Sequence, residues 1–295
     1  SAGEVDLQSR SLFFNNYTFL KKGEKRNNYS TLLWRTAKGS HLALYPNLNI
    51  NDPVWRTVFR DVRVRRALSI AIDRALINQV LYFGLAVESN NTVLTDSPLF
   101  KPYYQTDWSQ YDPRKANELL DQMGLTLRDL EGYRLRSDGK RISLIVDVPA
   151  ASHIAHENDV GLILAEGWRA LGLDIVVYTP PGAELKLRRD LGEFTVHLHG
   201  EAEMDLFTYP DWVFPTSGRY WHPKVGKWYE TAGVKGEEPT GVMLELLDLY
   251  DRIKQEPNLE LRHQLVQKAV QVHIEHGPFH LGTVGRKPFP VIVKD

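Results

Sequence analysis

A strand–helix–strand pattern in the middle of the chain leaves it few possible folds. A β-rich run from Ile142 to Val148 precedes a predicted helix from about His153 to Leu171, and a second run from Asp174 to Tyr178 follows. The apolar residues of the helix recur with the period of one buried face, namely Val160, Ile163, Leu164, Trp168 and Leu171. This order predicts a βαβ unit with a right-handed crossover, and an α/β fold class.

The residues around this unit extend the pattern on both sides. Before it, Ser137 to Lys140 contains an Asp-Gly pair, which supplies the positive φ angles of a tight hairpin turn and joins Tyr133–Arg136 to the first strand. After it, a short helix near Glu184–Leu191 leads to a strand at Phe194–His199. We therefore expect at least one further strand in the same sheet.

The strongest helix signal begins at Asp61, whose carboxylate is suited to an N-cap. Apolar residues at spacings of three and four predict one helix to about Tyr82, with Gly84 as its stop and with an inner face of Val64, Ala67, Leu68, Ala71, Ile72 and Leu76. Four arginines lie mainly off that face: Arg63, Arg65, Arg66 and Arg74. We expect the arginines at the start of the helix to be solvated or paired with nearby acids: Arg60, Arg63, Arg65 and Arg66.

Three more helices carry recognisable end signals. Asp112-Pro113 predicts a helix that ends at Gly124, with Ala116, Leu119, Leu120 and Met123 inside. Near the C-terminus we expect helices at about Thr240–Gln255 and Leu259–Glu275, the second capped by Asn258.

The two ends of the chain show weaker patterns. Lys21 to Ser30 has no clear period and is interpreted as a loop, whereas Thr31 to Leu44 is predicted to be extended. Short extended pieces are expected at Pro278–Val284 and Pro288–Val293.

The composition removes several classes of protein from consideration. The chain lacks cysteine, which excludes disulfides, thiolate nucleophiles and cysteine-ligated metal sites. A net charge of -1 gives no global field for holding nucleic acid, and no apolar run is long enough to span a bilayer. P-loop, dinucleotide-binding and nucleophile-elbow motifs are missing, so we predict no cofactor. The N-terminal SAGEVDLQSR lacks the apolar region of a signal peptide, as expected for a cytoplasmic chain or for a mature or truncated form of an exported one.

Four stretches, in this order, resemble the family-5 solute-binding proteins that load peptides onto ABC importers. The first is FRDVRVRRALSIAIDRALINQVLYFGLA, Phe59 to Ala86, and the second is YDPRKANELLDQMG, Tyr111 to Gly124. The third combines SDGKRISLIV with the later GWRALGLDIVV, and the fourth is LELRHQLVQKAVQVH in the last predicted helix. The resemblance covers nearly the whole chain but corresponds only to the C-terminal half of such proteins.

This resemblance implies one mixed-sheet lobe of a type II periplasmic-binding-protein fold. By analogy, residues 45–276 would form lobe two, while residues 1–44 and 277–295 would cross back into lobe one. It further implies a periplasmic, extracytoplasmic carrier without enzymatic activity, whose partners are a peptide or other small-molecule ligand and the ABC permease subunits in the membrane. The chain would then be a truncated fragment. Relatives also carry glycans, opines, metal chelates and antibiotic peptides, so the solute stays open.

The ligand site is expected where open α/β sheets bind ligands, outside the carboxyl ends of the strands. This rule indicates Pro149 to His153 after one strand and His199 to Glu201 after another. The resemblance implies aromatic and acidic contacts shortly after the latter strand, and an acidic anchor for a peptide amino terminus. The ligand-binding candidates are His199, Glu201, Tyr209, Asp211, Trp212 and Trp221. The alternative is that Trp212 and Phe214 simply pack the lobe.

Two histidine groups leave a metal site open as an alternative. On a strand, His197, His199 and Glu201 would share one face and could serve a metal-dependent hydrolase. A second group comprises His273, His276 and His280, of which the first two would share a helical face. A third hypothesis is an interaction or chaperone domain that associates through lobe-one remnants, namely Phe13, Phe14, Leu32, Leu33 and Trp34.

Overall fold

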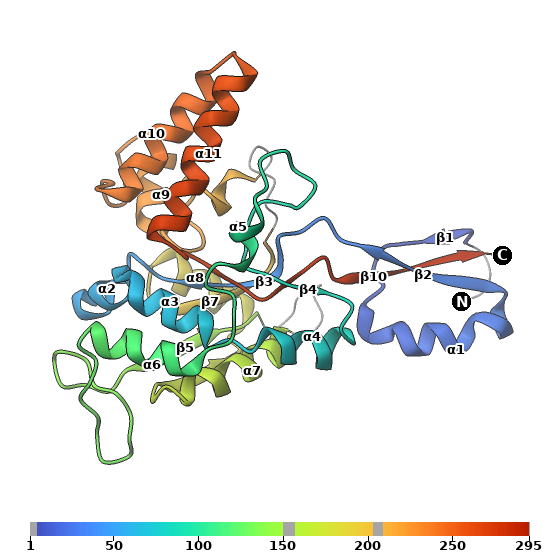
Figure 1. Ribbon diagram of the computed structural model, residues 1–295, viewed down its shortest axis with the longest axis horizontal. Helices are drawn as coiled ribbons and strands as arrows, with labels where there is room; N and C mark the ends of the chain where they lie inside the picture. Colours follow the sequence, from blue (N-terminus) through green and yellow to red (C-terminus); the bar gives the residue numbers. More distant parts are fainter. Residues whose placement is uncertain (1–4, 150–156, 203–208, 295) are drawn as a thin grey trace.

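The computed structural model describes residues 5–149, 157–202 and 209–294. Within these ranges five strands form a central sheet (Figure 1), in the order β6 (Asp174–Tyr178), β5 (Ser143–Asp147), β7 (Val196–Ala202), β3 (Ser40–Pro46) and β8 (Leu281–Gly282). β5 runs parallel to both β6 and β7, while β3 is antiparallel to its neighbours β7 and β8. The predicted α/β class with a mixed sheet is confirmed.

The βαβ unit is present as predicted. α7 (Glu157–Arg169) connects β5 to the parallel β6, with Ser143 opposite Asp174. Trp168 is fully buried, and its Nε1 donates to the carbonyl of Leu68 at 2.8 Å, which fixes this helix against α3 (Val62–Ile70). The predicted helix start at His153 lies outside the described residues. α8 (Gly182–Asp190) then leads to β7, which extends the sheet.

The predicted hairpin turn before β5 is also confirmed. Gly139 has a φ of 79°, and the Arg136 amide donates to the Lys140 carbonyl at 2.7 Å. The Arg136 side chain lies nearly buried between the carboxylates of Asp52 and Asp138, so the turn is tied to the start of α2 (Pro53–Arg60).

The single helix expected from Asp61 to Tyr82 is wrong, because the structure divides it into α3 and α4 (Arg74–Tyr82). Asp61 caps α3 as predicted, by accepting from the Arg63 amide. Asp73 then accepts from the Leu76 amide at 2.8 Å and caps a separate helix. In this second helix Leu76, an expected core residue, is 42% exposed.

Arg65, expected to be solvated or paired with an acid, is instead buried, and Arg74, expected off the apolar face, is buried as well. Arg65 is 3% exposed and donates to the carbonyls of Phe59 and Pro278, at 2.6 and 2.9 Å, and also to that of His276. Arg74 is 1% exposed and donates to the carbonyls of Gly282, Ser69 and Ser109. Backbone carbonyls therefore compensate the buried guanidinium groups, a kind of partner that charge patterning does not reveal.

The remaining predicted helices agree with the structure. α6 (Pro113–Gln122) is capped by Asp112, and α11 (Leu259–His276) by Asn258, which accepts from the Leu261 amide at 3.0 Å. α10 (Val242–Gln255) packs beside α11. The other elements are η1 (Phe14–Asn16), β4 (Val87–Glu88), α5 (Pro102–Thr106), η2 (Pro210–Trp212), α9 (Pro223–Glu230) and β9 (Val284–Gly285).

The two ends of the chain build a second, smaller sheet that projects to one side (Figure 1). Within the described ranges it contains β1 (Leu7–Gln8), β10 (Pro288–Lys294) and β2 (Tyr29–Arg35). The loop expected at Lys21–Ser30 is wrong, since α1 (Tyr17–Asn27) occupies most of it. Only Leu20 of this helix is buried, and contacts to the next strand hold it: Tyr29 donates from its hydroxyl to the Leu20 carbonyl at 2.6 Å. These tertiary contacts leave no periodic signal in the sequence.

Two adjacent segments link the small sheet to the central one. Residues 36–39 run from β2 to β3, and residues 286–287 run from β9 to β10. The Thr36 amide donates to the Lys287 carbonyl at 3.3 Å, and the Arg286 amide to the Lys38 carbonyl at 3.4 Å. The predicted extension over Thr31–Leu44 thus consists of two strands separated by a crossing segment.

Candidate functional site

The carboxyl edge of the central sheet faces the small sheet. β5 ends at Asp147 and β7 at Ala202, on the same edge because these strands are parallel. Ser40, the first residue of β3, pairs with Ala202, and the crossing segment 36–39 comes directly before it. This is the edge where the strand-end rule places a ligand. Of the segment predicted there, Pro149 to His153, only Pro149 is described.

A buried ion pair lies at this edge. Asp147 has a side chain that is 0% exposed, and Arg188 of α8 donates to both of its carboxylate oxygens, at 3.0 and 3.1 Å. Burial raises the pKa of Asp147, and Arg188 opposes that shift. At the end of β6, Tyr178 donates to Glu184 at 2.9 Å. The sequence analysis missed this group because 41 residues separate Asp147 from Arg188.

One face of β3 and β7 carries a cluster of aromatic and histidine rings. Tyr45 lies opposite His197 in the ladder, so these side chains share a face with His199. The segment after β7 covers them: the Trp212 and Tyr220 rings are 4.1 Å apart, and Tyr220 lies 5.3 Å from His199 between ring centres. The cluster therefore lines one face of β3 and β7 with closely packed, polarisable rings.

The structure places the predicted ligand-binding residues at different depths. Trp212 is 5% exposed and Trp221 is 1% exposed, and Trp221 stacks on Phe279 at 4.9 Å between ring centres. Asp211 is half-buried; it accepts from Thr216 through its carboxylate and from Trp221 through its carbonyl. Tyr209 is 51% exposed. The side chain of Glu201 lies outside the description. A ligand-binding role for each of these residues stays a prediction.

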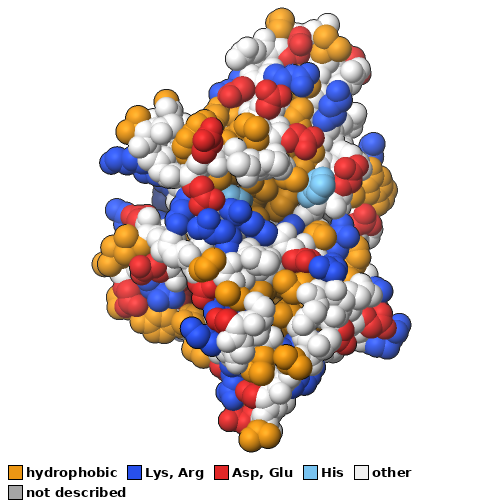
Figure 2. Space-filling view, turned by 90° about the vertical axis from the view of Figure 1, so that its left-hand side faces the viewer, with side chains coloured by type: hydrophobic (Ala, Val, Ile, Leu, Met, Phe, Trp, Pro, Cys, Tyr) orange, Lys and Arg blue, Asp and Glu red, His pale blue; other side chains and the backbone are white. Residues whose placement is uncertain are grey.

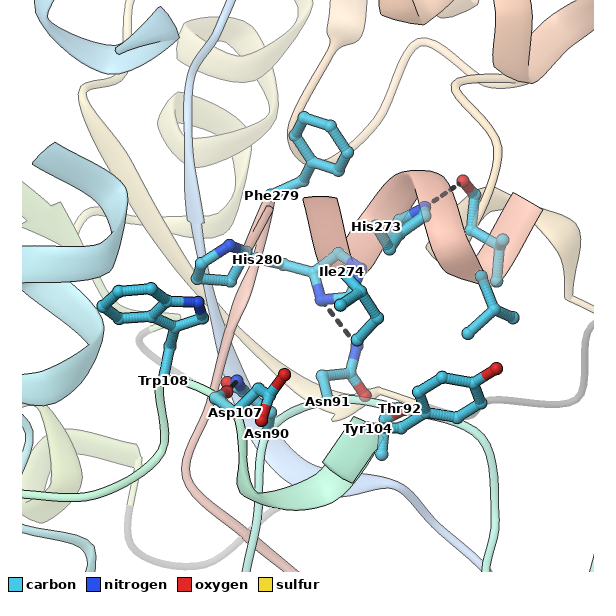
Figure 3. Close-up of a pocket in the computed structure, with 13 residues that line it drawn as sticks. Asn90, Asn91, Thr92, Tyr104, Asp107, Trp108, His273, Ile274, Phe279 and His280 are labelled. Carbon is cyan, nitrogen blue, oxygen red and sulfur yellow. Dashed lines mark hydrogen bonds between the residues drawn. The ribbon is translucent and has the colours of Figure 1, made fainter. Parts of the chain in front are cut away.

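A small cavity with a mixed polar and apolar lining lies beside the rings, between residues 90–108 and the end of α11 (Figure 3). Its volume of about 40 Å³ suits one ordered water and is far too small for a peptide. His280 spans from the cavity to the ring cluster: its Nδ1 lies 3.0 Å from the Asn91 amide nitrogen, and its Nε2 lies 2.7 Å from the Trp212 carbonyl. His280 therefore links the cavity wall to the segment that carries Trp212.

Burial holds the histidines of this region in the neutral form. It lowers the pKa of His197 and of His280 to about 3 and that of His273 to about 4. His280 donates through Nε2–H to Trp212 and accepts at Nδ1 from Asn91, while His273 donates through Nε2–H to the Val213 carbonyl. At neutral pH these rings are uncharged supports of the backbone, not cationic contacts for an anion.

Neither histidine group forms a recognisable metal site in the part of the chain that the structure describes, where no set of three metal-ligating side chains converges. His197 and His199 share a face as predicted, with ring centres 5.5 Å apart. In the second group, the ring centres of His273 and His280 lie 5.7 Å apart, whereas His276 is exposed and lines a different pocket.

Comparison with known proteins decides the family. The model of bacterial extracellular solute-binding proteins, family 5 Middle, matches residues 1–218. The chain belongs to this family. Among the described helices none is long and apolar enough to cross a membrane.

The relatives of this family-5 chain are binding proteins. The oligopeptide-binding protein OppA of Lactococcus lactis is 26% identical over 187 residues, which cover 57% of this chain and 29% of OppA. A solved oligopeptide-binding protein OppA is 30% identical, with a TM-score of 0.82, over 100% of this chain and 49% of that one. The chain thus spans half or less of the length of these relatives. MelB of Agrobacterium fabrum, solved with stachyose, has a TM-score of 0.75 over 99% of this chain and 44% of MelB, but at 16% identity it shows the fold alone.

Proposed function

We propose that this chain is part of the solute-binding component of an ABC importer, which binds a peptide or a similar small solute outside the cytoplasm and delivers it to a membrane permease. The observation that carries the proposal is the match of the whole chain to the solved OppA, at 30% identity and a TM-score of 0.82. We further propose that the protein is a carrier and has no catalytic role.

The domain boundaries follow from the same proposal. Residues 1–44 and 277–295 would contribute to lobe one, and residues 45–276 would form lobe two. This division is supported by the small sheet, whose described strands all come from the two ends of the chain. Ligand would bind between the lobes at the carboxyl edge, close to the two crossing segments.

Contacts to the solute are proposed for the side chains that reach the surface at this edge. Tyr209 is half exposed, and His199 and Asp211 are partly exposed, so these groups are available without repacking. Trp212 and Trp221 would act from behind, by fixing the segment that carries Asp211. A peptide suits such a mixture of aromatic and polar contacts, whereas the relatives give the metal-hydrolase alternative no support.

The test is a ligand panel measured on two proteins, this chain and the product of the complete reading frame that encodes it. Tri- to pentapeptides, opines and oligosaccharides are added, and the melting temperature of each protein is followed. A solute that binds the folded state raises the melting temperature by mass action. We expect peptides to raise it in the complete product, and less in this chain if a lobe is missing. Peptides without effect, beside a clear shift from a sugar or an opine, would exclude the peptide proposal but leave the carrier intact.

A further inference from the structure

A second pocket opens at the opposite edge of the central sheet. Pro46, the last residue of β3, pairs with Val196, the first residue of β7, so the chain after β3 emerges at the amino edge of the parallel strands. Leu48 follows directly and lines a pocket of about 340 Å³. The pocket lies between α2, α3 and α9 on one side and α10 and α11 on the other. It is therefore distinct from the edge proposed to hold the transported solute.

The floor of this amino-edge pocket is apolar. Figure 2 shows hydrophobic side chains gathered in a hollow on this face, with histidine and with Lys and Arg side chains at its border. The apolar lining residues come from five different parts of the chain and are Leu48, Val62, Val225, Val242, Met243 and Phe279. A volume above about 300 Å³ with such a lining is typical of small-molecule sites.

One wall carries a buried polar group without a partner. His222 is 4% exposed, and its Nδ1 has no hydrogen-bond partner among the described residues. Native proteins pair the large majority of such buried atoms. His222 also lines the pocket, so a small turn of its ring would bring the unpaired nitrogen to a ligand or an ordered water there. Burial, together with the positive charges of Arg60, Arg56 and Arg65, lowers the pKa of His222 well below its usual value. The ring is neutral and can donate one hydrogen bond.

The charge around His222 favours an anion. Glu237 is shared between Arg56 and Arg60, at 3.1 Å from each. Arg65 is compensated by backbone carbonyls alone and adds a further positive charge. The pocket lining thus holds the guanidinium groups of Arg60 and Arg65 and the carboxylates of Glu237 and the exposed Glu238. Arg56 pairs with Glu237 from outside the lining and offsets part of its negative charge.

Arg60 has the capacity to bind such an anion. Its side chain is 43% exposed; Nε donates to the Leu48 carbonyl and Nη2 to Glu237, while Nη1 has no partner within the described chain. The free Nη1 hydrogens match the acceptor oxygens of a carboxylate.

We propose that the amino-edge pocket binds a small amphipathic carboxylate, with its apolar part on the floor and its carboxylate between Arg60 and His222. The site would be independent of solute transport at the carboxyl edge. The floor supplies affinity through buried apolar area, and the two polar side chains supply the preference for an acid.

The test uses 3-phenylpropionate and its neutral isostere 3-phenylpropionamide on this chain, with binding measured by calorimetry and by amide chemical shifts. We expect the acid to bind at least about ten-fold more tightly than the amide, because the amide lacks the charge that strengthens these hydrogen bonds. Arg60→Met and His222→Phe should each weaken binding of the acid about ten-fold. Arg114→Met, on the distant α6 with a side chain that is 80% exposed, is the matched control and should leave binding unchanged.

Three results would overturn the proposal. The first is no binding of the acid at about 5 mM. The second is equal affinity for acid and amide. The third is a loss of binding in Arg114→Met as large as in Arg60→Met. Because Arg60 is partly exposed, Arg60→Met keeps the test valid even if His222→Phe fails to fold.

Discussion

Most side chains of the central sheet are buried, whereas several of those in the small sheet are exposed to solvent. Every residue of β3 in the central sheet is buried, and Leu44 is 0% exposed. In the small sheet, Leu32 and Trp34 of β2 are 44% and 50% exposed, and Phe19 of α1 is 78% exposed. In the central sheet, β3 is therefore fully enclosed by this chain, whereas the small sheet leaves apolar side chains exposed. The chain spans 49% of the solved OppA that it resembles.

Mild acid should lower the free energy of unfolding of the central body more than any substitution considered below. The buried neutral histidines lie in this body, and none occurs in the strands and helix of the small sheet. The folded-state pKa values of His197, His273 and His280 are about 3, 4 and 3, below the unfolded value of about 6.5. The unfolded state then binds more protons, so stability is complete above pH 6.5 and falls as the pH drops toward 4. At pH 5 we expect a loss of about 2 kcal/mol for each histidine.

Denaturant unfolding at pH 7.5 and pH 5 measures this loss. His280→Gln should make the stability less dependent on pH, by about the share of one histidine, whereas His276→Gln, which changes an exposed ring, should not. An equal free energy of unfolding at both pH values would contradict the buried neutral state of these rings.

The second effect contrasts one tryptophan from each region. Trp168→Ala removes a fully buried ring and its hydrogen bond to Leu68, and should cost about 3–5 kcal/mol. Trp34→Ala, in the small sheet, should cost less than about 1 kcal/mol because half of that ring is already in water. Both values follow from denaturant unfolding at pH 7.5. Similar losses for the two variants would mean that the small sheet is as well packed as the central one.

The sequence predicted the central body far better than the small sheet, and the reason is physical. Caps at Asp61, Asp112 and Asn258 act within one turn, so they are visible in a few adjacent residues. The helix α1 instead depends on Tyr29 and on Glu24, which accepts from the Thr31 amide. Such contacts arise only once the strand has folded back on the helix.

The candidate site shows the same limit. The shared face of His197 and His199 follows from the two-residue period of a strand and was predicted. The pairing of Asp147 with Arg188 was not predicted, because it depends on how separate elements pack. The burial of Trp212 and Trp221 has the same cause, since residues from β3 and from the end of the chain cover them.

A third, smaller effect concerns the buried arginine that joins α4 to the C-terminal strands. Arg74→Met removes hydrogen bonds to the carbonyls of Ser69, Ser109 and Gly282 and leaves these acceptors without that donor. We expect a loss of about 2–3 kcal/mol in the free energy of unfolding. Arg114→Met, at an exposed ion pair, should change it by less than about 0.5 kcal/mol. If Arg74→Met were as stable as the starting chain, the carbonyl contacts would contribute nothing to the fold.

The smallest effect on stability should come from the exposed face of the small sheet, where solubility responds instead. Leu32 and Trp34 are two residues apart on β2 and therefore point to the same face. Changing both to Ser removes apolar side chains that are already about half in water, so the free energy of unfolding should fall by less than about 1 kcal/mol. Self-association, followed by sedimentation velocity across a concentration series, should decrease because this uncovered surface is the contact that two copies would share. Unchanged self-association in the double variant would show that two copies do not contact each other through this face of the small sheet.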